Sequence, residues 1–514
     1  MKLSYGAAAL LALASGTSAQ NVVQFDLNRG LPGVRLGSAH PKLSRRATLT
    51  SDLVNNITGG AYYVDVSVGT PGQTVSMVLD TGSSDAWVVG TRANLCIDRK
   101  LQEYYQQQCL ATYNPARSSS YKMLYRNSFN IKYLDGGGAA GDFITDDFTI
   151  AGTTIKSLQM GYARQTSRGT GILGIGFNTS ESAAVPYPNI IDQLRDQGKI
   201  GTKAYSVWLN DRRSQTGTIL FGGIDKGKFI GPLKILPIIK ADEAATPTAF
   251  DVAFYGMSVK YTNGSKSDIR TSLSNDKLAA VLDTGSTLSY LPEYMTSQIF
   301  TELGAVTESQ VTGLTLIDCK YLTSEPDLVV SFDFGGTATI TVPVWELVLD
   351  LLADYQYLMP ADIPFDNVCV FGIQSTTGFE ESQVVENATF ALLGETFLRS
   401  AYAVYDLDSH QIGIAQANLN STDVDIVELK AEDKGLPTLI GALAQQTTNP
   451  PRTTTPTDGG GGGGTQTVTV TATPDNAGRG GSARLPGGGG AGDLIAVMAI
   501  TSIFALVGGA LVAL

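Results

Sequence analysis

Histidine is scarce in this 514-residue sequence, which contains only two, His40 and His410. A Ser/His/Asp triad, a Cys/His pair or a multi-histidine zinc site would have to use one of these residues, so these classes of site are nearly excluded. Basic residues are also few: 36 Lys and Arg stand against 48 Asp and Glu, and the formal net charge is -12. Because such a chain repels polyanions, nucleic acid is not expected as a partner.

The two ends of the sequence look like targeting signals. Residues 1–19 combine an early lysine, an apolar run and small residues at the end, which predicts a cleavable secretory signal. Residues 494–514 are apolar and uncharged, and a polar spacer with small residues precedes them. This order is typical of a glycosylphosphatidylinositol (GPI) attachment signal, and a tail-anchored helix is the alternative. We expect a GPI anchor on the external face of the cell membrane, or a place in the cell wall. The candidate attachment residues are Asn476, Gly481 and Ser482.

Two further segments flank the expected folded part. Residues 20–46 end in the dibasic pair Arg45-Arg46, which predicts a pro-segment removed by a processing convertase. Residues 429–493 are rich in Thr, Pro and Gly, which predicts a disordered stalk. N-glycosylation sequons agree with secretion and occur at Asn56, Asn178, Asn263, Asn387 and Asn420.

The intervening chain, residues 47–428, is patterned mainly as β-strands. Short runs alternate apolar and polar residues between Gly- and Pro-containing turns, as at residues 62–68. Helical patterning is confined to brief stretches such as 190–197 and 293–303. We therefore expect a mainly β fold with a few short helices.

An internal repeat gives the strongest functional signal. The run Val-Leu-Asp-Thr-Gly-Ser at residues 78–83 recurs unchanged at 281–286, and each copy is an apolar strand that enters a tight acidic turn. Each copy has a downstream companion, at 171–174 and 391–394, in which two apolar residues precede a glycine. A single Asp-Thr-Gly turn is as often structural as catalytic. Two copies with both companions indicate a duplicated unit.

In these motifs and in their order the chain resembles the pepsin-type aspartic proteases over about residues 62–417. The resemblance implies a bilobal fold of two pseudo-symmetric β lobes, which we place at residues 47–237 and 238–428. It also implies that Asp80 and Asp283 are the catalytic carboxylates. The threonines of the two turns would bond across the lobes, the glycines would allow close backbone approach, and the serines would bond the carboxylates. These supporting residues are Thr81, Gly82, Ser83, Thr284, Gly285 and Ser286.

The hairpin at residues 131–137 resembles the flap of this family. Tyr133 would be the flap tyrosine and Trp87 its partner, although Trp87 alone is typical of a core residue. Leu134 departs from the pattern, since the best-known members have glycine there. Asp135 lies where fungal relatives use an acidic residue to meet a basic substrate side chain, and a simple turn-forming role is the alternative.

Taken with the signal, the dibasic pair and the apolar tail, the chain most resembles the fungal yapsin-type, OpsB-like endopeptidases. That branch acts at the cell surface, often after Lys or Arg. Arg212-Arg213 is a second dibasic pair, which is either another processing site or an exposed hairpin tip.

The expected chemistry follows from two adjacent carboxyl groups. Because two adjacent negative charges repel each other, ionisation of both groups is unfavourable and the pair shares one proton. This sharing is an established property of aspartic-protease dyads. The ionised member can take a proton from water while the other donates to the peptide carbonyl oxygen. This mechanism predicts activity at acidic pH without a cofactor or a metal.

The four cysteines form an even set compatible with two disulfides in an oxidising compartment. One bridge in each lobe is the expected pairing among the three that are possible. Zinc is disfavoured because neither pair has short ligand spacing and no histidine lies nearby. The expected bridges join Cys96 to Cys109 and Cys319 to Cys369.

Two functions of other classes compete with proteolysis. A catalytically inactive, wall-binding relative would usually lose a dyad aspartate or the flap tyrosine, and all three of these residues are present. A carboxylate-pair glycosidase would be expected to carry an aromatic-rich sugar cleft, which three tryptophans do not favour. The expected partners are peptide or protein substrates, the membrane through a lipid anchor, and the convertase, and the chain is expected to be a monomer.

Overall fold

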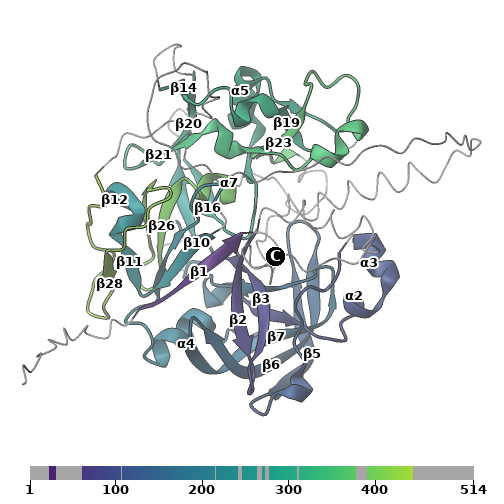
Figure 1. Ribbon diagram of the computed structural model, residues 1–514. Coiled ribbons are helices and arrows are strands. Elements are labelled where there is room, and N and C mark those ends of the chain that lie inside the picture. The colour runs from purple at the N-terminus through teal and green to yellow at the C-terminus, as the bar shows by residue number, and fades with distance from the viewer. Residues whose placement is uncertain are drawn as a thin grey trace, which may run out of the picture.

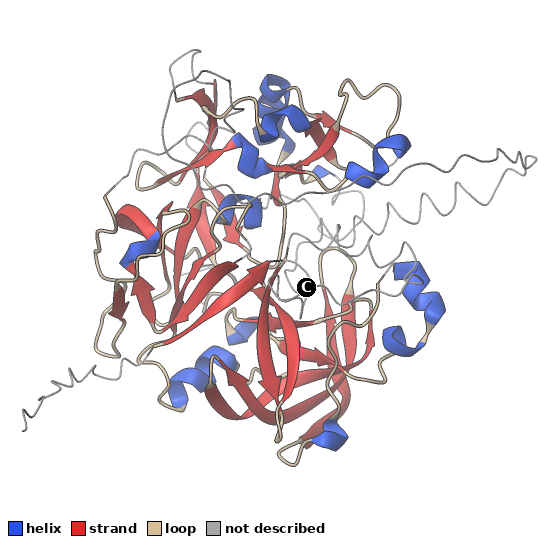
Figure 2. Ribbon diagram, viewed as in Figure 1, coloured by secondary structure: helices blue, strands red, loops and turns tan. Residues whose placement is uncertain are grey.

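The computed structural model describes residues 22–29, 61–105, 107–214, 216–240, 246–262, 269–272, 277–309, 312–377 and 391–443. Strands dominate this part of the chain and the helices are short, which confirms the predicted mainly β class (Figure 2). Within it, no helix is both long and apolar enough to cross a membrane. Several predicted features fall outside the described residues: the signal at 1–19, Arg45-Arg46, Asn56, Asn263, Asn387, Asn476, Gly481, Ser482 and the tail at 494–514.

One 13-stranded sheet runs through the described part of the molecule, in the order β12-β27-β26-β9-β10-β1-β2-β3-β8-β4-β7-β6-β5 (Figure 1). It crosses the predicted lobe boundary, because β26 from the second half pairs with β9 from the first. The strands are β1 (Val23–Arg29), β2 (Tyr62–Val68), β3 (Gln73–Asp80), β4 (Ala86–Val89), β5 (Lys122–Lys132), β6 (Gly138–Ile150), β7 (Thr153–Thr166), β8 (Gly171–Gly174), β9 (Ala204–Trp208), β10 (Thr216–Phe221), β12 (Phe229–Pro237), β26 (Ala401–Asp406) and β27 (Gln411–Ala417).

Smaller sheets build the rest of the second half. A five-stranded sheet, β13-β16-β25-β17-β24, carries the second copy of the repeat. Its strands are β13 (Asp251–Phe254), β16 (Leu278–Leu282), β17 (Ser289–Leu291), β24 (Ile373–Ser375) and β25 (Ala391–Leu393). The other strands are β11 (Gly223–Asp225), β14 (Gly256–Tyr261), β15 (Ile269–Ser272), β18 (Val306–Thr307), β19 (Thr315–Asp318), β20 (Leu328–Asp333), β21 (Thr339–Pro343), β22 (Val348–Leu349), β23 (Val368–Phe371) and β28 (Ile426–Glu428).

The helices follow local sequence signals. Helix α4 (Ile190–Asp196) opens with a capping box between Asn189 and Asp192. Helix α5 (Glu293–Leu303) begins after a proline and ends at Gly304, whose φ of 66° is the left-handed conformation that glycine tolerates. The remaining helices are α2 (Asn94–Ile97), α3 (Arg99–Tyr105), α7 (Glu395–Leu398) and the 3₁₀ turns η1 (Pro115–Arg117), η2 (Asn178–Ser180), η3 (Lys226–Lys228), η4 (Cys319–Leu322), η5 (Val344–Leu347) and η6 (Ala353–Leu358).

Strand β1 lies inside the segment predicted as the pro-segment. It pairs with β10 from Val23 opposite Phe221 to Asn28 opposite Thr216, and it also contacts β2. Its residue Leu27 is fully buried. Part of the expected pro-segment is therefore a structural strand of the central sheet.

The predicted stalk boundary at residue 429 is too early. Leu429 is buried, and the backbone NH of Leu233 in β12 donates to the carbonyl of Leu439 at 2.9 Å. Apolar side chains of the segment, including Leu436, pack against the cluster around β12. Residues 429–443 therefore belong to the fold, because their leucines bury apolar surface that a Gly- and Thr-rich stalk lacks.

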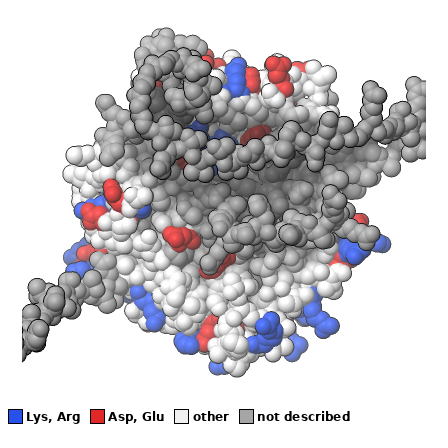
Figure 3. All heavy atoms as spheres, viewed as in Figure 1, with Lys and Arg blue, Asp and Glu red and all other residues white. Residues whose placement is uncertain are grey.

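Charged side chains are scattered over the face seen in Figure 3. Among the described residues drawn there, acidic and basic groups are interspersed and form no continuous patch of one sign. The largest cluster of buried side chains includes Leu79 and Leu282, which directly precede the two Asp-Thr-Gly turns. The repeat is therefore anchored in the core.

Candidate active site

Two strand ends position the duplicated turns. Strand β3 ends at Asp80, and β16 ends one residue before Asp283. Each runs parallel to the strand formed by its companion motif, β8 and β25 respectively. The backbone NH of Ile175 donates to the carbonyl of Asp80 at 2.9 Å, and the NH of Asp283 donates to the carbonyl of Leu393 at 3.0 Å. The companion strands thus hold both turns in place.

The two threonines join the turns across the molecule. Thr81 Oγ1 donates to the Leu282 carbonyl at 2.8 Å and accepts from the Thr284 NH at 2.9 Å. Thr284 Oγ1 donates to the Leu79 carbonyl at 2.9 Å and accepts from the Thr81 NH at 3.1 Å. These four buried hydrogen bonds are related by a local two-fold symmetry, so they set the turns face to face.

Each dyad carboxylate is held by its own turn. It accepts hydrogen bonds from the NH of the glycine two residues later and from the hydroxyl of the serine three residues later. In the first turn the donors to Asp80 are Gly82 N, at 2.8 Å, and Ser83 Oγ. In the second turn the donors to Asp283 are Gly285 N, at 2.7 Å, and Ser286 Oγ, at 2.6 Å.

The glycine of the first turn lets the second carboxylate come close. A Cβ atom added to Gly82 would lie 2.6 Å from Asp283 Oδ1, a distance that real Cβ atoms do not show. Both Asp80 and Asp283 are fully buried. The structure therefore brings the two predicted catalytic residues together in one site away from bulk water.

Burial raises the pKa of both carboxyl groups, and their mutual contact shifts the two values in opposite directions. The pKa of Asp80 rises well above its usual value, because the negative charge of Asp283 adds to the cost of burial. The pKa of Asp283 also rises through burial, but hydrogen bonds from Ser286, Gly285 and the Asp80 carboxyl oppose that rise. The two coupled carboxyl groups can therefore share one proton.

A hairpin formed by β5, β6 and the turn between them covers this dyad. Tyr133 is buried, and its hydroxyl accepts a hydrogen bond from Trp87 Nε1 at 2.8 Å. Burial raises the pKa of Tyr133, and the negative charge of Asp80 raises it further. Tyr133 therefore lies within electrostatic range of the dyad. The turn closes through the NH of Gly136, which has a φ of 77° and donates to the Tyr133 carbonyl. The predicted partnership of Tyr133 and Trp87 is thus a direct hydrogen bond, and the flap role of this hairpin stays a prediction.

The sequence matches the family described as Eukaryotic aspartyl protease over residues 61–417. This chain belongs to that family.

Several fungal relatives of this aspartyl protease are similar over most of its length. A probable aspartic-type endopeptidase opsB of Aspergillus fumigatus is 35% identical over 81% of this chain and 80% of its own. An acid protease of Saccharomycopsis fibuligera is 34% identical over 69% and 80% of the two chains. Aspartic proteinase 3 of Saccharomyces cerevisiae is 28% identical over 75% and 74%. The chain is thus an aspartic endopeptidase of the pepsin type.

The flap of this aspartyl protease reaches across to the second half. Leu134 is 7% exposed and belongs to a cluster of buried side chains that includes Leu288 and Tyr290, which lie shortly after the second Asp-Thr-Gly turn. Where the best-known members have glycine, leucine therefore supplies an apolar contact between the flap and the opposite lobe.

Asp135 is not free at the flap tip. Its side chain is 2% exposed and forms an ion pair with Arg168. Arg168 carried no signal in the sequence, because the pairing depends on how the turn after β7 packs on the flap. The predicted contact between Asp135 and a basic substrate residue therefore has a competitor within the protein.

A second acidic cluster beside the dyad also gave little signal in the sequence. Asp85 is buried, accepts from the Ser182 NH at 2.6 Å and from the Tyr187 hydroxyl at 2.7 Å, and has a pKa raised by burial. Burial also raises the pKa of neighbouring Glu181 to about 9. The only signal was the position of Asp85 directly before the apolar strand β4.

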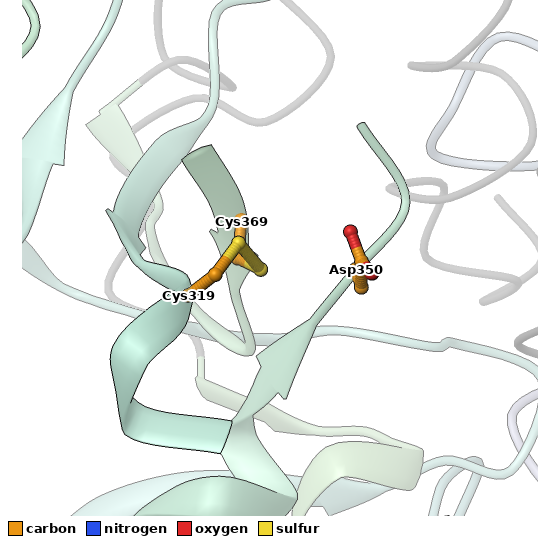
Figure 4. A group of neighbouring side chains, drawn as sticks. All are labelled: Cys319, Asp350 and Cys369. Carbon is orange, nitrogen blue, oxygen red and sulfur yellow. A yellow bond between two sulfur atoms is a disulfide. The ribbon is translucent and has the colours of Figure 1, made fainter. Parts of the chain in front are cut away.

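Both expected disulfides are formed, Cys96 with Cys109 and Cys319 with Cys369, which confirms the predicted pairing. Asp350 lies beside the second bridge, and its carboxylate and the two sulfurs lie within 4.8 Å of one another (Figure 4). Such a cluster could suggest a metal centre. Because both sulfurs are used in the bridge, they cannot serve as thiolate ligands, and the cluster does not fit a metal ion.

Two of the predicted sequons lie in the described part. The side-chain nitrogen of Asn178 donates to Asp192 at 3.0 Å, and that of exposed Asn420 donates to Asp211 at 2.6 Å. Both nitrogens already make an internal hydrogen bond, and glycosylation at either stays a prediction.

The dibasic pair at the β9–β10 connection is packed against η5. The Arg212 NH donates to Glu346 Oε1 at 2.9 Å, and the Arg213 guanidinium lies 4.7 Å from the centre of the Trp345 ring. A processing enzyme would first have to break these contacts, which favours the structural alternative for this pair.

Proposed function

We propose that this aspartic endopeptidase hydrolyses peptide bonds with a water molecule activated between Asp80 and Asp283. The observation that supports this mechanism is the meeting of two buried carboxyl groups, Asp80 and Asp283, on turns that bond each other through their threonines. The ionised member of the pair would take a proton from the water, while the protonated member would donate its proton to the carbonyl oxygen of the peptide. A tetrahedral diol would form with no acyl-enzyme.

The same pair gives the expected pH dependence. Activity requires the state with one proton on the dyad, so it is lost when pH rises far enough to ionise both groups. Activity also falls at very low pH, when both carboxyl groups become protonated. Because burial raises both pKa values, the working range extends upward from that of two free carboxyl groups but remains acidic.

The test is peptide cleavage at acidic pH by the wild type beside Asp283→Asn. The variant is expected to lose activity by about 10³-fold or more, as for removal of a general acid–base group. Asp406→Asn is a matched control, because Asp406 is another buried carboxylate with a raised pKa in the central sheet. Wild-type rates in folded Asp283→Asn would refute the mechanism. Absence of cleavage by the folded wild type would instead favour the inactive-module alternative.

We further propose that the protease is secreted and attached to the outer cell surface. The support is in the sequence: the signal-like start, the dibasic pair and the apolar tail. Release of the protein from intact cells by a phosphatidylinositol-specific phospholipase C would support the anchor. Recovery of the full-length chain from the cytosol, with residues 1–19 retained, would refute this location.

The predicted preference for basic residues assigns recognition to Asp135. Since Arg168 neutralises this carboxylate, the preference requires that a substrate cation replace an internal one.

A further inference from the structure

Both oxygens of the Asp135 carboxylate accept hydrogen bonds within the flap region. Its Oδ1 accepts the NH of Gly137 at 2.8 Å, and its Oδ2 accepts Arg168 Nη2. The side chains are 2% and 15% exposed, respectively. A partly desolvated, charge-assisted contact of this kind is stronger than an exposed ion pair.

The turn that carries Arg168 is fixed from several sides. The NH of Arg168 donates to Thr166 Oγ1 at 2.9 Å, and the next NH, of Gly169, donates to Gln107 Oε1 at 2.8 Å. Ser167 bonds the base of the flap, since its NH donates to the Gly138 carbonyl at 3.1 Å. Arg168 is therefore presented to the flap by a rigid turn rather than by a loose loop.

Arg168 also contacts the flap tyrosine. Its guanidinium carbon lies 5.1 Å from the centre of the Tyr133 ring, within the range of a cation–π contact. One cation thus bridges the two flap residues that the sequence marks for substrate contact, Tyr133 and Asp135.

A basic substrate side chain that approached Asp135 would also approach this cation. To reach Oδ2 it would have to displace Arg168, and the displaced guanidinium would remain nearby as a like charge that repels it. An apolar side chain does not suffer this repulsion.

We infer that Arg168 is a specificity-determining residue, which acts through Asp135 and directs cleavage away from Lys and Arg at the residue before the scissile bond. The inference rests on the proposed proteolytic function. It reverses the substrate preference expected from Asp135 alone and assigns that preference to the charge at position 168.

The experiment compares two peptides that differ only in Lys or Leu before the scissile bond. Cleavage of the Leu peptide by the wild type, and its loss in Asp283→Asn, first establishes the function on which the inference rests. The ratio of kcat/KM for Lys over Leu then tests the inference. We expect a ratio below about one for the wild type, and a rise of about 10- to 100-fold in Arg168→Gln, the range for one charge-assisted hydrogen bond.

Three further variants separate charge from folding. Arg168→Lys keeps the cation and should keep a ratio close to that of the wild type. Arg168→Gln combined with Asp135→Asn should lose the gained preference for Lys. Arg164→Gln is the matched control, because Arg164 lies on β7 and pairs with Asp142 at 3.1 Å on the same hairpin, with its side chain 47% exposed. This control should leave the ratio unchanged.

Several results would overturn the inference. One is a strong preference for Lys in the wild type, a measurement that needs no variant. Another is an unchanged ratio in Arg168→Gln that melts at the wild-type temperature. A third is a Lys preference that persists after Asp135→Asn is added.

Discussion

The two halves of the active site share six identical residues and diverge in the segments immediately after them. Trp87 and Tyr290 occupy the same place, each pairing in antiparallel fashion with its companion strand, β8 or β25. Trp87 bonds the flap tyrosine, whereas Tyr290 clusters with the flap leucine. The repeated hexamer therefore makes the two turns symmetric, and the residues after it give each lobe a different contact with the single flap.

The halves also differ in how contact between their carboxyl groups shifts the pKa of each. The charge of Asp283 raises the pKa of Asp80, while the hydrogen bond between the carboxyl groups works in the opposite sense on Asp283. A symmetric backbone thus brings together two carboxyl groups that can share one proton. General acid and general base roles can arise from the same sequence motif.

The sharpest test of the coupling between the two carboxyl groups removes one carboxylate at a time. Asp80→Asn and Asp283→Asn should each reduce turnover by about 10³-fold. In Asp283→Asn the pKa of Asp80 should also fall, because the neighbouring negative charge is gone. Carboxyl ¹³C chemical shifts followed against pH would measure this. An unchanged Asp80 titration would contradict the coupling.

Because the two turns are symmetric, replacing either threonine should lower the free energy of unfolding by a similar amount. Thr81→Val and Thr284→Val each remove a hydroxyl that makes two buried hydrogen bonds. Each should lower the free energy of unfolding by about 2–4 kcal/mol, since a buried carbonyl and a buried NH lose partners. Urea denaturation would measure both. Thr301→Val, at an exposed position of α5, is the control and should change little. Costs that differ widely between the first two would mean that the halves are not equivalent.

The dyad should make stability depend on pH. A carboxyl group with a pKa raised by folding contributes stability below its unfolded pKa and loses it as pH rises through the folded pKa. The wild type should therefore be more stable near pH 4 than near pH 7. Replacing both Asp80 and Asp283 by Asn should flatten this dependence, as calorimetric Tm values at several pH values would show. An equal Tm difference between the two proteins at all pH values would contradict it.

The smallest expected effect concerns the flap contact with the second half. Leu134→Ala removes part of an apolar side chain from the cluster around Tyr290. We expect KM to change by about threefold with kcat nearly constant, since the loss of apolar contact alters flap closure more than the chemistry. Steady-state kinetics at acidic pH would measure this split. A large loss of kcat would instead place Leu134 in the catalytic machinery.

Local patterns in the sequence predicted the features that depend on neighbouring residues. The hexamers, helix α5 and the flap turn are encoded in short stretches, so their positions could be read before the fold was known. The Arg168 contact could not, because Asp135 and Arg168 come together only when β6 and β7 pair. Strand β1 was missed for the same reason: its partner β10 lies far along the chain, although Val23, Phe25 and Leu27 alternate as a strand should.

Strand β1 also has a consequence for maturation. Strand β1 precedes Arg45-Arg46 in the sequence. Cleavage after this pair would therefore separate β1 covalently from the rest of the protein, while its hydrogen bonds to β10 remained. The freshly cut enzyme would be a two-chain particle, and departure of the short peptide would leave an empty slot in the middle of the central sheet. Without a replacement strand, the backbone NH and carbonyl groups of β10 and β2 that pair with β1 would be exposed to water. Native mass spectrometry of the processed protein should therefore detect the peptide still bound.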